Sequence, residues 1–185
     1  MMKKLVLAAL GVIASTAASA EGYAGLQFGT SRANESCEGT LSCDKSSSTY
    51  KLFGGYKFTP QLAAEASYTQ YGKVTASVDV PPVVDLSMKA SGFGFGLALH
   101  GDLAPSWTAV ARFGLAFNKM KVNATVYDES GSDSDNTTTA YVGFGVGYKL
   151  TKALHLNATW DVSNAEYAGE SLRFNLFSLG VSYGF

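Results

Sequence analysis

Large apolar side chains recur at every second position through eight short segments between residues 21 and 185. This period of two is the spacing of a β-strand with one apolar face, whereas the i, i+3, i+4 spacing of an amphipathic helix is hardly found. The segments are 23–30, 50–58, 62–69, 92–100, 108–118, 140–150, 154–162 and 177–185. The pattern predicts an all-β chain of eight strands.

The opposite face of these segments carries small residues and most of the ionisable ones. The ionisable residues on it are Lys51, Lys57, Glu65, Arg112, Lys149 and Asp161. An eight-stranded barrel has room inside for side chains and little else, so we expect the small and charged residues inside and the bulky apolar ones outside. An apolar exterior of this extent fits lipid and not water. Strands of about 9–11 residues span the hydrocarbon layer, and barrel closure pairs every backbone group.

The connections between the segments alternate in length. Short ones follow the second, fourth and sixth segments, and long polar ones cover 31–49, 72–89, 119–138 and 163–171. Short turns on one rim and long loops on the other are the plan of outer-membrane barrels. We therefore predict an eight-stranded antiparallel up-and-down transmembrane β-barrel. Aromatic residues near the short turns should form an interfacial girdle; they are Tyr23, Tyr56, Tyr148, Tyr183 and Phe185.

The first twenty residues have the order of a secretory leader: Lys3 and Lys4, an apolar run over 5–14, and Ala18-Ser19-Ala20. The apolar run is about half of the roughly 20 residues that a spanning helix needs. We expect residues 1–20 to be a signal peptide cleaved after Ala20, and residues 21–185 to form one barrel domain. Loss of the two lysines takes the formal charge from −1 to −3, and no basic cluster indicates nucleic-acid binding.

Cys37 and Cys43 are the only cysteines, and they lie in one polar stretch, ESCEGTLSCDKSSS. In an exported chain this arrangement predicts one loop disulfide. Two thiolates with no histidine nearby do not complete a tetrahedral metal shell, so we expect neither a metal nor a cofactor.

The short turn in GYKFTPQLAAEASY and the ending SLGVSYGF, together with the eight segments, resemble the OmpA-like family of outer-membrane barrels. The resemblance implies the outer membrane of a Gram-negative bacterium. The ending is similar to the insertion signal read by the barrel-assembly machinery, with Ser178, Gly180, Tyr183 and Phe185 in the matching positions. Larger members add a peptidoglycan-binding domain, which we do not expect in a chain that ends at the barrel.

Glu65 and Arg112 occupy inward positions in mid-barrel, where opposite charges must pair to offset their desolvation. The family resemblance suggests a salt-bridge gate in the lumen. The other interpretation is a static polar plug, with Lys57, Lys149 and Asp161 completing the network. His100 and His155 lie near the short turns, remote from the outer leaflet, and assemble no catalytic set, so we expect no enzyme.

Two outer connections invite a ligand hypothesis. The acidic run over 128–136 departs from the calcium-binding EF-hand spacing and is expected to be a solvated hairpin tip. The second connection carries an apolar tip, which either contacts a partner or packs on a neighbouring hairpin. That tip comprises Val80, Pro81, Pro82, Val83 and Val84.

The sequence predicts a structural or porin-like barrel with a narrow polar lumen that passes at most small ions. The alternative is a surface adhesin that acts through its outer loops. The expected partners are outer-membrane lipid and lipopolysaccharide, the barrel-assembly machinery and a host surface ligand, and the expected state is a monomer.

Overall fold

The structure is a computed structural model that describes residues 21–33, 42–43, 46–78, 84–126, 129–167 and 170–185. Nearly all of these residues lie in strands. None of the described residues belongs to a helix long and apolar enough to cross a membrane. The strands are β1 (Gly22–Ala33), β2 (Ser42–Cys43), β3 (Ser46–Lys57), β4 (Leu62–Val78), β5 (Val84–Ala104), β6 (Trp107–Val126), β7 (Glu129–Lys149), β8 (Leu154–Tyr167) and β9 (Glu170–Gly184).

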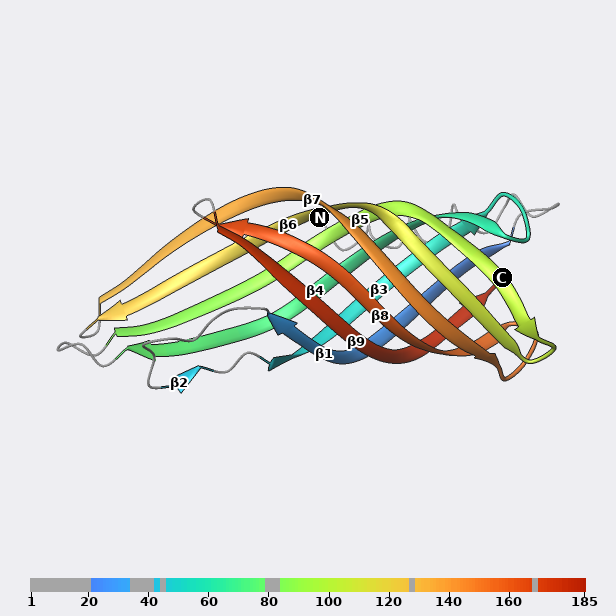
Figure 1. The fold of residues 1–185 in the computed structure, drawn as a ribbon, viewed down its shortest axis with the longest axis horizontal. Helices are drawn as coiled ribbons and strands as arrows, with labels where there is room; N and C mark the ends of the chain where they lie inside the picture. Colours follow the sequence, from blue (N-terminus) through green and yellow to red (C-terminus); the bar gives the residue numbers. More distant parts are fainter. Residues whose placement is uncertain (1–20, 34–41, 44–45, 79–83, 127–128, 168–169) are drawn as a thin grey trace, which may run out of the picture.

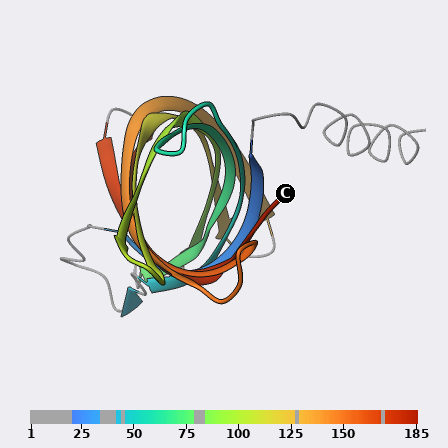
Figure 2. The ribbon, with the colours of Figure 1, turned by 90° about the vertical axis from the view of Figure 1, so that its right-hand side faces the viewer.

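Eight of the strands close into a barrel. Each of β3 to β8 pairs antiparallel with the next strand along the chain, β1 pairs with β3, and β1 also pairs with β9 to complete the ring (Figure 2). The predicted eight-stranded antiparallel up-and-down barrel is confirmed. The ninth strand, β2, pairs only with Ser77 and Ala76 of β4, beyond the part of β4 that pairs with β3. Two residues are too few for an alternating pattern to reveal.

Several strands are much longer than the membrane requires. β5 and β7 have 21 residues each and β6 has 20, against the roughly 9–11 that span the hydrocarbon layer. The β4–β5 and β6–β7 hairpins extend beyond the rest of the barrel at the end remote from the short turns (Figure 1, left). Many residues that the sequence predicted to lie in loops therefore lie in strands. A hairpin with water on both faces has no need for an apolar face, so its sequence shows little alternation.

A β-bulge bends β4 where it leaves the barrel wall. The register with β5 shifts between Gln70 and Gly72, which leaves Tyr71 as the additional residue. Gly72 has a φ of 93°, and a Cβ at this position would collide with the Ser47 side chain and the Ser48 carbonyl. Glycine is therefore required for both its backbone conformation and its lack of a side chain.

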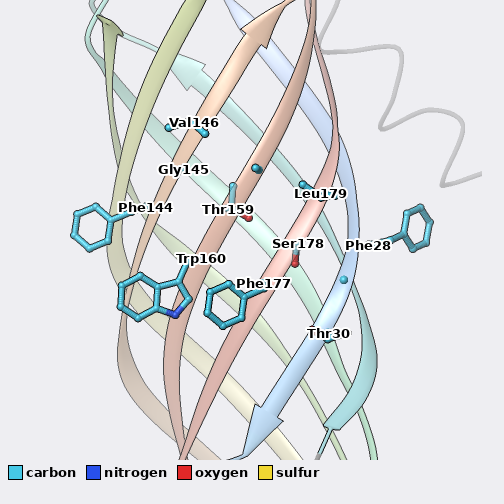
Figure 3. A pocket seen from close by; sticks show the side chains of 12 residues that line it. Phe28, Thr30, Phe144, Gly145, Val146, Thr159, Trp160, Phe177, Ser178 and Leu179 are labelled. Carbon is cyan, nitrogen blue, oxygen red and sulfur yellow. The ribbon is translucent and has the colours of Figure 1, made fainter.

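The outer wall of the barrel is apolar, as predicted, and the lumen holds both polar and apolar side chains. Phe28, Phe144, Trp160 and Phe177 project away from the barrel wall (Figure 3), and each is at least 42 % exposed. Gln27, Lys51, Glu65, Arg112 and Asp161 are buried.

The girdle prediction is wrong for Tyr23. Its side chain is 8 % exposed and lies inside the barrel, whereas the other four predicted members are exposed. Tyr23 has the same parity as the inward Gln27, so the alternation itself places it in the lumen. Its proximity to a short turn was a weaker guide than its parity.

Candidate functional site

The first candidate site is the ion pair between Glu65 of β4 and Arg112 of β6, which the structure brings together. Arg112 Nε lies 2.8 Å from Glu65 Oε1 and 3.1 Å from Oε2, and the second contact has hydrogen-bond geometry. The Glu65 side chain is 0 % exposed and the Arg112 side chain is 3 % exposed. Between them runs β5, where Gly96 pairs with Glu65 and Ala98 with Arg112. These small residues leave space in the lumen for the two long side chains to meet.

Aromatic residues complete the surroundings of this pair. The Tyr23 hydroxyl donates a hydrogen bond to Glu65 Oε2 at 3.0 Å, and His100 Nε2 lies 3.2 Å from the same hydroxyl. The Arg112 guanidinium carbon lies 5.2 Å from the centre of the Phe53 ring, within the range of a cation–π interaction. The Glu65 carboxylate thus receives hydrogen-bond donors from two strands, β1 and β6.

A second buried ion pair crosses the lumen from β3 to β8. Lys51 Nζ lies 3.1 Å from Asp161 Oδ2, with side chains 4 % and 8 % exposed. Gly143 of β7 pairs with Asp161, and a Cβ at Gly143 would collide with the Asp161 carboxylate. Lys51 was among the inward residues of the alternation but not among the candidate site residues, because its partner lies across the barrel and 110 positions along the chain.

Lys57 and Lys149 do not join this central network. Lys57 Nζ is 2.9 Å from Glu21 Oε2 and Lys149 Nζ is 2.7 Å from Asp102 Oδ1, both on the short-turn rim. The hydrogen bond and positive charge of Lys57 lower the pKa of the Glu21 carboxyl from its ordinary value. Their strand parity points inward, but these positions are too close to the rim to reach mid-barrel. They line, with His155, a vestibule of about 590 Å³ that ends at Arg112.

An apolar cluster fills the lumen on the opposite side of the ion pairs. Its members are Tyr71, Ala90, Met120, Phe174 and Leu176, all at most 6 % exposed. The Tyr71 hydroxyl donates to Asn118 Oδ1 at 3.1 Å, and Asn118 Nδ2 donates to the Asn164 carbonyl at 2.8 Å. The alternating pattern did not predict this cluster, because Met120 lies in a predicted loop and the other four members lie just outside the eight predicted segments. Inward parity continued from 118 and 178 would have located Met120, Phe174 and Leu176.

Only a small space separates the apolar cluster from the second ion pair. A cavity of about 20 Å³ lies between Lys51, Tyr71, Asp161 and Leu176, which is about the volume that one water molecule requires. The lumen thus consists of a vestibule at the short-turn rim, a layer of ion pairs and an apolar layer, in that order.

The other residues singled out in the sequence are those of the insertion signal, the two cysteines, the apolar loop tip and the acidic run. Ser178 and Gly180 of β9 pair with Gly29 and Gln27 of β1, and Tyr183 pairs with Ala24, so the predicted insertion signal is part of the strand that closes the barrel. Cys43 lies in β2, and Val84 begins β5. Cys37, Asp128 and residues 80–83 lie outside the described residues. Among the described residues, no group of three histidine, cysteine or acidic side chains could hold a metal ion.

The fold and its inverted polarity define a class, the bacterial outer-membrane β-barrels. The family model for the outer membrane protein beta-barrel domain matches residues 5–185, and the chain belongs to this family.

An uncharacterized protein of Haemophilus influenzae is 29 % identical over 184 residues, which cover 99 % of this chain and 97 % of that protein. Among solved structures, the attachment invasion locus protein Ail of Yersinia pestis has a TM-score of 0.61 at 17 % identity, covering 91 % of this chain and 100 % of Ail; it has also been crystallised with the heparin analogue sucrose octasulfate. Neisserial surface protein A has a TM-score of 0.63 at 17 % identity, covering 89 % of this chain and 97 % of its own. At this level of identity the likeness to solved structures shows the fold.

Proposed function

We propose that the protein is a structural outer-membrane barrel whose lumen is closed at rest and passes at most small ions. The observation that carries this proposal is the order of layers in the lumen. The vestibule of about 590 Å³ ends at Arg112, and the space beyond the ion pairs measures about 20 Å³. A hydrated ion would have to separate a buried ion pair and then cross an apolar constriction, each of which is unfavourable.

Single-channel recording in planar bilayers tests this proposal. The wild-type protein is expected to show no steady open level. A stable open conductance of the folded barrel would contradict it. Heat-modifiable migration in outer-membrane fractions serves as the control that the recorded protein is folded.

A surface-interaction role is the second candidate, and the long hairpins favour it. β5, β6 and β7 have about twice the length needed to span the membrane and carry polar strands into the medium. Hairpins of this kind can present an edge or a tip to a host ligand. The test is deletion of residues 80–84 followed by assays of binding to host cells and matrix. Unchanged binding would count against adhesion through this tip.

The proposal includes the expected route to the membrane. Residues 1–20 are removed after Ala20, Cys37 and Cys43 form a disulfide, and the barrel-assembly machinery inserts a monomer that has no catalytic activity. The mature protein contacts outer-membrane lipid and lipopolysaccharide. Amino-terminal sequencing of the protein from membranes is expected to begin at Glu21, and non-reducing peptide mapping is expected to recover the two cysteines in one linked fragment.

A further inference from the structure

Three lysines stand side by side on the outer wall of the barrel. Lys73 of β4 pairs with Lys89 of β5, and Lys89 pairs with Lys121 of β6. All three are exposed. Cβ atoms of directly opposed residues are about 4.5–5.5 Å apart, and like charges at this spacing destabilise a sheet. Lys119, also exposed, lies two positions before Lys121 on the same face of β6. We call these four residues the lysine row.

The described residues beside the lysine row are neutral. Lys119 lies between Ser91 and Asn136, and Lys121 has Ser134 as its neighbour on β7. Among the described residues, the row takes part in none of the ion pairs, which all lie within the lumen or at the short-turn rim. The row therefore presents uncompensated positive charge to the outside of the barrel.

The lysine row marks the end of the apolar wall on the hairpin side. On the short-turn side of the lysine row, Tyr68, Phe93 and Phe117 line an outer groove of about 760 Å³. Lys119 and Asn136 also line this groove. The rings of Tyr68 and Phe93 lie 4.9 Å apart, which makes a continuous apolar floor. The wall thus changes from aromatic to cationic between Phe117 and Lys119, a single step on the same face of β6.

We propose that the lysine row and the groove beneath it bind one phosphorylated glycolipid of the outer leaflet, of the lipid A type, an inference that rests on the proposed contact with lipopolysaccharide. Its phosphates would accept charge-assisted hydrogen bonds from the lysine ammonium groups, which relieves their mutual repulsion. Its acyl chains would lie along the groove over Phe93 and Phe117. A soluble sulfated glycan would also match the charge of the row, but it has no apolar part for the groove, which favours the lipid.

The test uses full-length mature protein in phosphatidylcholine nanodiscs with and without lipid A. The triple variant Lys73→Gln/Lys89→Gln/Lys121→Gln should bind lipid A about tenfold more weakly or worse, since it lacks three charged donors. Dephosphorylated lipid A should bind wild type and variant equally. In nanodiscs without lipid A, the variant should unfold at the same urea concentration as wild type or at a higher one, because the repulsion between the lysines is gone.

Two controls separate the row from net charge. Lys73→Arg/Lys89→Arg/Lys121→Arg keeps the charges and should keep the binding. Arg32→Gln/Lys152→Gln/Arg173→Gln removes three charges elsewhere on the barrel and should also keep it. If the triple glutamine variant does not fold, Lys89→Gln alone, at the centre of the row, should still weaken binding measurably.

Three results would overturn the proposal. One is equal lipid A binding by wild type and the glutamine variants. Another is loss of heparin binding in the variant while its lipid A binding stays intact, which would assign the row to a sulfated glycan. The third is displacement of lipid A by inorganic phosphate at equal concentration, which would show that the groove and acyl chains contribute nothing.

Discussion

At the scale of single residues, the lumen is organised by charges that must find partners out of water. Glu65 and Arg112 are both buried, so either one alone would be an uncompensated charge. Alternation predicted that both point inward. It could not predict their contacts, because these depend on the small Gly96 and Ala98 between them and on Tyr23 from β1.

Removing one member of this pair should be costly. We expect Arg112→Met to lower the free energy of unfolding by about 3–5 kcal/mol, because it leaves Glu65 buried without its cation. The double variant Glu65→Gln/Arg112→Met should recover much of this loss, since no lone charge remains. Urea titration in lipid vesicles measures the free energy of unfolding of both variants, with heat-modifiable migration as the readout of the folded fraction.

The rim pair provides the matched control for that experiment. Lys149→Met removes the partner of Asp102, whose side chain is 69 % exposed, and should change the free energy of unfolding far less than Arg112→Met does, because water screens exposed charges. Equal losses from Arg112→Met and Lys149→Met would show that burial does not set the energy of the central pair.

At the scale of strands, the sequence predicted the existence and direction of each strand better than its length. The eight apolar segments correspond to the parts of the strands that face lipid. The ends of β4 to β7 lie beyond the apolar wall, so lipid imposes no apolar face there and the pattern fades. The bulge at Gly72 coincides with this transition, because it bends β4 where the strand leaves the wall.

Gly72→Ala should test the importance of the bulge. The φ of 93° is unfavourable for alanine, and the new Cβ would collide with Ser47 and the Ser48 carbonyl. We expect a loss of about 1–3 kcal/mol in unfolding free energy. Gly101→Ala is the control, since a Cβ there has open space around it. A similar effect of both substitutions would mean that the bulge is not specified by Gly72.

The last strand permits a separation of assembly from stability. Phe185 is 58 % exposed, and its backbone exchanges hydrogen bonds with Gly22. Phe185→Ser keeps those backbone bonds and loses only an aromatic group at the barrel surface. If the ending is read during insertion, this variant should reach the outer membrane in severalfold lower yield while refolding normally into detergent. Tyr56→Ser, from the same rim and 44 % exposed, should keep the wild-type yield and also refold normally. Equal yields for the two variants would contradict a role of the ending in insertion.

At the scale of the whole molecule, the barrel inverts the usual partition of polar and apolar groups, and lipid makes that arrangement stable. Residue types and parity were sufficient to predict this inversion, because lipid acts on every strand in the same way. The contacts among the side chains that fill the lumen were less predictable. They join strands far apart in the sequence, as in the contact of Tyr71 with Phe174, whose rings lie 5.2 Å apart. Parity alone assigns each side chain to the lumen but not to a depth or a partner.

The two closing layers lie in series, so opening one should not open the pore. We expect Glu65→Ala/Arg112→Ala, which removes one of the two ion pairs of the lower layer, to remain closed in planar bilayers because the apolar cluster still excludes water. Phe174→Ala/Leu176→Ala, which opens the upper layer, should also remain closed, because the two ion pairs still fill the lumen. Only the combination of all four substitutions, which leaves the Lys51–Asp161 pair as the one remaining ion pair across the described lumen, should open a path beside that pair and give a steady small-ion conductance. If Glu65→Ala/Arg112→Ala adds no conductance to Phe174→Ala/Leu176→Ala, then Glu65 and Arg112 do not act as a gate. Conductance from Phe174→Ala/Leu176→Ala alone would show that the apolar cluster is the only barrier.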